Sequence, residues 1–408
     1  MADPAVIGAK AGFARPDGPA IAVLLTALVA FQALSTDMYL ASLPALMEYF
    51  STDVPTVQLT LSVFLIGSAL GQLFYGPLSD RFGRRPVLCA GLSVYLASSI
   101  ACALAPSIEI LILARLAQAI GSCSGPVLGR AVVRDVHGPV AGARVLAYMS
   151  SAMAMAPVLA PIAGSYLQVA FGWRANFVVL AGFSLAVLMS VVIFLAETNR
   201  SRDPSALELR RLIANYGGLF ADRRYVGFVA VLSCTYGSIF AFISGSSFVV
   251  IDLIGVDTSH FGYVFGGVVL GYVSGAFAAG RLGPRLGIER LVLAGALINT
   301  AAGAFGAALA WAGVVNLWAV AAPMTLVLFG NGLIFPTAIA GAIAPYPNKA
   351  GVASAMMGFV QLASAALFGT AVGYLADQSS RPMMTAVALV SAAGLAAFLL
   401  VVRPRFRA

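Results

Sequence analysis

Long apolar runs, separated by short polar or Gly/Pro/Asn-rich stretches, cover almost the whole chain. Each run is long enough to cross a hydrocarbon core of about 30 Å as a helix. The pattern therefore predicts an all-α membrane protein with twelve transmembrane helices. Their expected ranges are about 20–45, 56–77, 86–105, 109–132, 145–170, 176–196, 225–250, 261–281, 290–311, 316–343, 351–375 and 383–402.

The longest polar segment divides these spans six and six. We therefore expect two six-helix bundles, and the predicted boundaries are a tail at 1–19, bundles at 20–196 and 225–402, a linker at 197–224 and a tail at 403–408. A repeat supports the division, because LGQLFYGPLSDRFGRR and LGYVSGAFAAGRLGPR share five residues at a constant offset of 200. Repeated halves are typical of membrane transporters.

The distribution of charged residues predicts the orientation of the chain in the membrane. Only 10% of the residues are charged, mean hydropathy is +0.94, and the basic residues gather in short loops. With both termini in the cytoplasm, 21 of the 24 Lys and Arg fall on the cytoplasmic side, and only Arg174 and Arg381 fall outside. Because positive loops are retained in the cytoplasm, the net charge of +8 indicates membrane orientation and not a nucleic-acid partner.

The sequence lacks the residue patterns that disulfide-bonded, metal-binding or ATP-hydrolysing proteins need. The four cysteines lie in apolar runs without a CxxC pattern, which disfavours disulfide and metal frameworks. The chain has no GxxxxGK[ST] phosphate loop, and His137 and His260 are expected on opposite faces of the membrane. We therefore expect neither an enzyme nor a primary pump, and no cofactor or metal.

Two ionisable residues fall well inside predicted spans. Asp37 and Arg115 each incur a cost of at least about 2.5 kcal/mol there, so such residues are site candidates by default. Removing a carboxyl group from water disfavours its charged form, which makes Asp37 a candidate to exchange a proton. The alternatives are a buried structural pair, or a shallow Asp37 near the outer surface.

Spaced glycines and aromatic residues suggest packing contacts and a pocket. Small residues at four-residue spacing let membrane helices approach closely, which predicts packing stripes at Gly121, Gly125 and Gly129 and at Gly267, Gly271 and Gly275. Aromatic residues expected near mid-span, among them Tyr39, Tyr236 and Phe240, are candidates to line an apolar pocket.

The stretch GPLSDRFGRRP at 76–86 carries the most specific pattern. Gly83 suits a left-handed turn, Asp80 can accept hydrogen bonds, and three arginines can pair with acids. Such a loop can latch two helix bundles together in one conformation. The alternative is a plain basic anchor on the cytoplasmic side.

This loop resembles that of the major facilitator superfamily between helices two and three. The matching residues are Gly76, Asp80, Arg81, Gly83, Arg84 and Arg85. STDMYL (35–40), RLAQAIGSCSG (115–125) and APVLAPIAG (156–164) are further similar to the bicyclomycin-resistance (Bcr/CflA) group of drug:proton antiporters.

The resemblance implies roles for these residues. Asp37 with Tyr39 would line the drug and proton cavity, and Arg115 with Gln118 would belong to a helix-four motif tied to proton coupling. Asp80 and Arg81 would form the latch. Asp135 would be the acid that Arg81 or Arg84 meets. Pro157, Pro161 and Gly164 match a helix-five antiporter motif.

The expected function follows from that resemblance. It is proton-coupled efflux of small amphipathic drugs or antibiotics by alternating access, with protons, drug-like molecules and the bilayer as partners. We expect a monomer in the inner (cytoplasmic) membrane. The alternative is a dedicated exporter or symporter of a metabolite such as a peptide, sugar or siderophore on the same fold.

Overall fold

The computed structural model describes residues 19–199, 201–208, 216–346 and 349–402. The side chains of 19–20, 137–144, 146–148 and 150–154 are outside this description, as are the predicted tails and the middle of the predicted linker. Every regular element among the described residues is helical. The predicted all-α class is confirmed.

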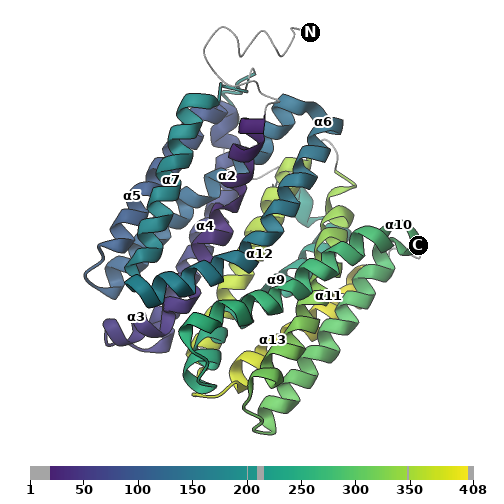
Figure 1. Ribbon diagram of the computed structural model, residues 1–408. Helices are drawn as coiled ribbons and strands as arrows, with labels where there is room; N and C mark the ends of the chain where they lie inside the picture. The colour runs from purple at the N-terminus through teal and green to yellow at the C-terminus, as the bar shows by residue number, and fades with distance from the viewer. Residues whose placement is uncertain (1–18, 200, 209–215, 347–348, 403–408) are drawn as a thin grey trace.

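The helices run in alternating directions (Figure 1). Their bounds are α2 (Pro19–Asp37), α3 (Leu43–Tyr49), α4 (Val54–Phe82), α5 (Arg84–Ala103), α6 (Ile108–Phe171), α7 (Arg174–Phe194), α9 (Arg223–Ser247), α10 (Thr258–Trp311), α11 (Leu317–Ile343), α12 (Ala350–Tyr374) and α13 (Arg381–Ala397). Three short elements are not α-helical: η1 (Leu40–Ser42) is a 3-10 helix, and η2 (Phe248–Leu253) and η4 (Phe398–Val402) are π-helices.

Ten helices among the described residues are long and apolar enough to span a membrane, and Met155–Phe171 is a shorter apolar helix. Two elements, α6 and α10, each contain two predicted spans. The 54 residues of α10 would measure about 80 Å, far more than one crossing, and Gly287 breaks the helix with a φ of 74°. The count of twelve and the cytoplasmic location of the termini stay predictions.

Local sequence explains where several helices begin. The carboxylate of Asp53 accepts the backbone N–H of Thr56 at 3.0 Å at the start of α4. The side chain of Asn316 accepts the N–H of Ala319 at 2.8 Å in the same way at the start of α11. Gly83, with a φ of 106°, ends α4 and lets α5 begin at the next residue.

The first-half helices are α2 to α7, and the second-half helices are α9 to α13. In Figure 1 they form the left and right parts of the molecule, and they meet where α4 packs on α12 and α6 packs on α10. We call the end where α4 stops and α5 starts the linker end, because residues 197–199 and 201–203 lie there. The other end, with α3, is the far end. Large apolar side chains such as Leu113, Phe171 and Trp318 point outward, as lipid contact requires.

The predicted glycine stripes are confirmed at five of their six positions. A Cβ on Gly125 would lie 2.2 Å from the carbonyl oxygen of Leu28, and one on Gly275 would lie 2.0 Å from that of Phe329. Gly121, Gly129 and Gly271 also face neighbouring helices within 4 Å. The prediction for Gly267 is wrong, because nothing lies within 4 Å of its Cβ position.

Candidate functional site

Asp37 is the last residue of α2 and lies near the middle of the apolar span Ile21–Tyr49. Its side chain is only 5% exposed. The hydroxyl of Thr36 donates to Asp37 Oδ1 at 2.9 Å. Among the described residues, no Lys, Arg or His side chain lies within ion-pairing distance of this carboxyl group. The side chain of Asp37 is therefore buried within the protein, and its depth in the membrane stays a prediction.

Arg115 is fully buried on α6 beside the same part of α2. Its Nη1 donates to the carbonyl of Ser35 at 3.1 Å and to Gln118 Oε1 at 2.7 Å. Its guanidinium lies over the rings of Phe64 and Tyr39, at 4.3 and 4.8 Å from their centroids. Cation–π contacts with these two rings thus stabilise the guanidinium in place of an ion pair with a carboxylate. The alternative of a buried pair between Asp37 and Arg115 is wrong in this conformation.

Tyr39 and Gln118 hold Arg115 in place. The hydroxyl of Tyr39 shares a 2.7 Å hydrogen bond with Thr60 on α4, and Tyr39 has no exposed surface in this conformation. The Gln118 amide donates to Ser99 on α5 at 2.8 Å. The charge of Arg115 is therefore fixed by contacts with α2, α4 and α6, and through Gln118 with α5.

Second-half helices supply an aromatic surface opposite Asp37. The hydroxyl of Tyr236 on α9 is close enough to Asp37 to interact with it electrostatically. The ring of Tyr236 lies 4.9 Å from Phe240 and 5.8 Å from Phe335 on α11, which in turn lies 6.3 Å from Tyr272 on α10. We call these four residues the aromatic wall. Three of them, Tyr236, Tyr272 and Phe335, are half-buried and keep some surface free.

The helix-five residues link Asp37 to the second half. A Cβ on Gly164 would lie 1.9 Å from the carbonyl oxygen of Met38, so only glycine allows this approach of α6 to α2. One turn earlier, Pro161 and Ile162 of α6 lie against Gly262 of α10, whose Cβ position is 2.6 Å from the Pro161 carbonyl oxygen. Pro157 lies one turn earlier again on α6. The turn η1 that follows Asp37 also contacts α9 and α10.

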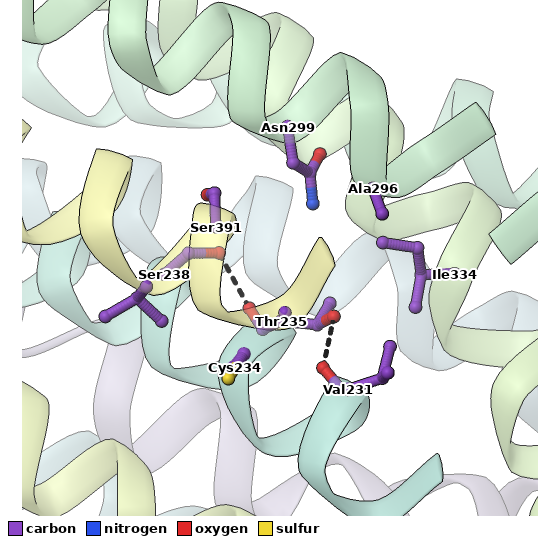
Figure 2. Close-up of a pocket in the computed structure, with 10 residues that line it drawn as sticks. Val231, Cys234, Thr235, Ser238, Ala296, Asn299, Ile334 and Ser391 are labelled. Carbon is purple, nitrogen blue, oxygen red and sulfur yellow. Dashed lines mark hydrogen bonds between the residues drawn. The ribbon is translucent and has the colours of Figure 1, made fainter. Parts of the chain in front are cut away.

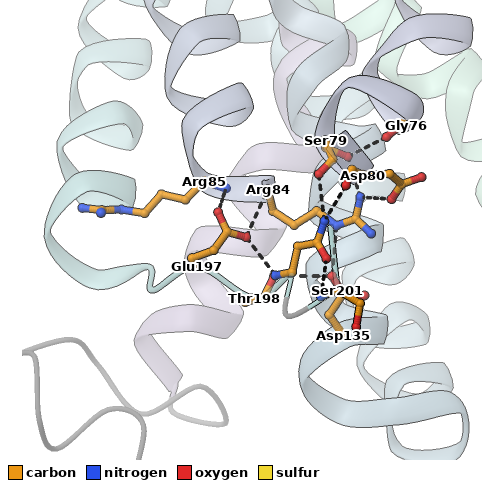
Figure 3. Close-up of polar contacts among 10 residues, drawn as sticks. Gly76, Ser79, Asp80, Arg84, Arg85, Asp135, Glu197, Thr198 and Ser201 are labelled. Atoms are coloured by element: carbon orange, nitrogen blue, oxygen red, sulfur yellow. Dashed lines mark hydrogen bonds and ion pairs between the residues drawn. The ribbon is translucent and has the colours of Figure 1, made fainter. Parts of the chain in front are cut away.

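The latch residues meet at the linker end. Arg84 Nη1 lies 2.6 Å from Asp80 Oδ1, and Arg84 Nε lies 3.0 Å from Asp135 Oδ2 (Figure 3). The sequence left open whether Asp135 meets Arg81 or Arg84, and the structure assigns it to Arg84. Asp80 also pairs with Arg84, whereas Arg81 forms no ion pair with a described residue and lies beside the ring of Phe82.

Two linker residues that the sequence did not single out complete the latch. Glu197 accepts the backbone N–H groups of Arg84 and Arg85 at 2.9 and 3.2 Å and so caps α5 (Figure 3). A Cβ on Gly83 would lie 2.5 Å from Glu197 Oε2, which explains the glycine. Asn199 donates to the carbonyls of Ser79 and Asp80 at 3.1 and 3.0 Å. Gly76 is less constrained, since nothing lies within 4 Å of its Cβ position.

The latch therefore joins α4, α5, α6 and the start of the linker within one half of the molecule. Its ion pairs do not reach the second half in this conformation, as far as the described residues show.

Contacts between the halves gather at the far end. Gln58 donates to the carbonyl of Ser244 at 2.9 Å, and the hydroxyls of Ser62 and Thr370 lie 2.7 Å apart. The hydroxyls of Tyr166 and Tyr263 also lie 2.7 Å apart. These contacts join α4 to α9 and α12 and join α6 to α10. They close the far end of the molecule.

No group of three or more His, Cys, Asp or Glu side chains that could hold a metal ion occurs among the described residues. The four cysteines are free thiols. The chemistry available at the site is that of one carboxyl group, one fixed guanidinium and an aromatic surface.

Many apolar helices, a buried carboxyl group between two sets of helices and a charged loop at one end define a multi-pass membrane transporter. The sequence model of the Major Facilitator Superfamily matches residues 25–369. The chain belongs to the major facilitator superfamily.

Relatives and a solved structure agree with this family. The chain is 31% identical to the uncharacterized MFS-type transporter YdgK of Bacillus subtilis, over 91% of this chain and 92% of that protein. It is 28% identical to the bicyclomycin resistance protein homolog of Haemophilus influenzae, over 85% of this chain and 87% of that protein. The resemblance to the bicyclomycin-resistance group is thereby confirmed.

The xylose transporter XylE from E. coli, in a partially occluded inward open conformation, superimposes with a TM-score of 0.72 at 13% identity, over 93% of this chain and 96% of that chain. This likeness confirms the major facilitator fold.

Proposed function

We propose that this protein is a proton-coupled exporter of small amphipathic drugs and that it works by alternating access. The observation that carries the proposal is the placement of Asp37, a buried carboxyl group without a cation, opposite the aromatic wall. A charge of this kind within a membrane span usually marks an ion or substrate pathway. The name of the bicyclomycin resistance relative supports a drug as the substrate.

The aromatic wall and the carboxyl group suit an amphipathic substrate. Half-buried rings offer apolar contact to a flat or greasy body, and the carboxylate can accept a hydrogen bond or attract a cation. Protonation of Asp37 removes its charge, which weakens that attraction. Proton binding and drug binding at Asp37 therefore oppose each other.

The cycle follows from this competition. When the far end is open, Asp37 takes a proton and releases the drug. When the linker end is open, Asp37 loses the proton and binds drug again. Proton entry supplies about 2.3 kcal/mol per charge for each 100 mV of membrane potential.

The remaining expectations belong to the same proposal. The protein acts as a monomer in the inner (cytoplasmic) membrane with both termini in the cytoplasm, and the two six-helix bundles move about the site. Drug then enters from the linker end and leaves at the far end.

The test is a drug-susceptibility panel in an efflux-deficient host with wild type and Asp37→Asn. We expect wild type to raise resistance in a manner abolished by a proton uncoupler, and Asp37→Asn to lose it at equal expression. Glu48→Gln, which alters an exposed acid on α3, is the matched control and should keep full resistance.

Two outcomes contradict the proposal. Full resistance from Asp37→Asn would exclude this carboxyl group from the mechanism. A wild type that protects against no compound of the panel would exclude drug export, and a dedicated metabolite exporter or symporter would then be the function to test.

A further inference from the structure

A small cavity lies inside the second half, enclosed by α9, α10, α11 and α13 (Figure 2). The side chains that matter for its chemistry are Thr235, Ser238, Asn299, Ile334, Val390 and Ser391. None of these belongs to the site described above.

The cavity lies directly behind the aromatic wall. On α9, Tyr236 and Phe240 belong to the wall, whereas Thr235 and Ser238 line the cavity. At 100° per residue these two pairs point to nearly opposite faces of the helix. On α11, Phe335 belongs to the wall and the adjacent Ile334 lines the cavity. The same two helices therefore separate the substrate surface from the cavity.

The lining is polar enough to hold water. The hydroxyl of Ser391 is buried and has no hydrogen-bond partner among the described residues. The side-chain amides of Asn299 and Asn331 lie 2.6 Å apart, and Asn331 donates to Ser238 at 3.2 Å. Figure 2 shows the Asn299 amide directed into the space between Ser391 and Ile334. The free space suits about one water molecule, and polar cavities of this size are normally hydrated.

The corresponding region of the first half is filled by aromatic rings. Phe31 lies 4.8 Å from Tyr95 and 4.9 Å from Phe183. Phe183 follows Arg174, the first residue of α7, by nine positions, and Val390 follows Arg381, the first residue of α13, by the same nine. In the first half, three aromatic rings thus pack together behind α2, whereas in the second half the cavity lies behind α9.

We propose that this cavity holds an ordered water at Ser391 and that the aromatic wall can move back only when this water is displaced, which sets the largest substrate the transporter accepts. The proposal rests on the proposed function and deepens it. A wall with room behind it adapts to ligands of different size, as promiscuous binding surfaces do. The packed rings of the first half, Phe31, Tyr95 and Phe183, are not expected to adapt to ligand size in this way.

The size limit is tested with Val390→Ile, which adds one methylene to the cavity. We expect export of the bulkiest compounds to fall about tenfold, whereas the smallest compounds are exported as by wild type. Tenfold is the lower end of the discrimination that one methylene gives in a closely fitted apolar pocket. Val387→Ile, also buried on α13 but outside the cavity lining, is the matched control, and any overpacking there should affect large and small compounds alike. An equal loss for large and small compounds, or no loss, would overturn the size limit.

The water is tested with Ser391→Ala in the purified protein. If a water joins this hydroxyl to its neighbours, the substitution removes a satisfied hydrogen bond and the melting temperature falls. If the cavity is dry, the substitution removes an unpaired buried hydroxyl, and an unchanged or higher melting temperature overturns the water site.

The two tests separate this inference from the proposed function. The melting measurement needs no transport, so it holds even if drug export is disproved. The transport measurement is interpreted only if the wild type exports drug and Asp37→Asn abolishes that export. Val390→Ile is then distinguished from Asp37→Asn because it reduces the export of large compounds alone.

Discussion

Two buried charges lie on neighbouring helices and are stabilised in different ways. Arg115 keeps its charge because ring faces, a carbonyl and the Gln118 amide surround it. Asp37 has one hydroxyl donor and no cation, and a carboxylate with so little compensation is costly in a protein interior. Asp37 is therefore the group whose charge state can change, and Arg115 is the group whose charge stays constant.

Asp222, outside the membrane spans, provides a pH test of stability. Partial burial alone would raise the pKa of Asp222, but hydrogen bonds from Tyr346 and from two backbone N–H groups outweigh burial, and the pKa lies below its usual value. A lowered folded-state pKa stabilises the protein above the unfolded value of about 3.9, and this stabilisation is lost as pH falls through the folded value.

We therefore predict that Tyr346→Phe lowers the melting temperature at neutral pH and that the difference from wild type shrinks as pH falls below about 4 and through the lowered pKa of Asp222 in the folded protein. Thermal unfolding of the purified protein from pH 7 to pH 3 checks this. A difference that stays constant over this range would mean that Tyr346 acts by packing and not through the carboxylate.

Several site residues carried no readable signal in the sequence. Glu197 follows the last apolar residues of its span and resembles any loop acid, and its function as a cap depends on the distant Gly83 turn. Tyr272 and Phe335 are ordinary aromatic residues in apolar helices, and only the packing of α10 and α11 brings them to the wall. In contrast, Asp37 and Arg115 were predictable because a charge in an apolar run is rare.

At the scale of elements, hydropathy located the helices, but it missed the full length of α4 and the helical stretch between two of the spans. The expected span 56–77 is α4 from Val54 to Phe82, because the helix continues past the apolar run to the Gly83 turn. The expected spans 261–281 and 290–311 are the two parts of α10, because the polar stretch between them is helical up to the break at Gly287 and again after it. Apolar length measures the membrane crossing, whereas backbone hydrogen bonding decides where the helix stops.

The latch offers a prediction at this scale. Arg84→Gln removes the cation shared by Asp80 and Asp135, and we expect it to lower stability by roughly 1–3 kcal/mol and to reduce transport. The reason for choosing Arg84 is geometric: it lies four residues after Asp80 and past the Gly83 break, which turns it toward α6.

Arg81→Gln is the matched control, since Arg81 is exposed and pairs with no described acid, and its effect should stay within about 0.5 kcal/mol. Thermal unfolding in detergent and the resistance assay measure both variants. Equal effects from the two substitutions would mean that the loop acts only as a basic anchor.

At the scale of the whole molecule, the structure is closed at the far end. Three polar contacts between the halves, Ser62 with Thr370, Gln58 with Ser244 and Tyr166 with Tyr263, lie there. Alternating access requires that these contacts break when the far end opens.

A disulfide across this end tests that requirement. The hydroxyls of Ser62 and Thr370 lie 2.7 Å apart, so cysteines at both positions can approach the S–S distance of about 2.05 Å. In a background without the four native cysteines, we expect oxidised Ser62→Cys/Thr370→Cys to stop transport and a reductant to restore it. Each single substitution should transport under both conditions. Undiminished transport by a fully cross-linked protein would contradict opening at this end.

The sequence alone determined the class of the protein and its candidate charges. Apolar runs, basic loops and the GPLSDRFGRRP pattern depend on transfer free energies and local turn geometry, which are properties of short segments. The tertiary structure decided which side chains meet. Asp135 pairs with Arg84 and not with Arg81, and Arg115 contacts ring faces and not Asp37. These contacts, and the cavity behind the aromatic wall, depend on how distant helices pack. Hydropathy carries no information on that packing, because lipid-facing and helix-facing apolar residues look the same in the sequence.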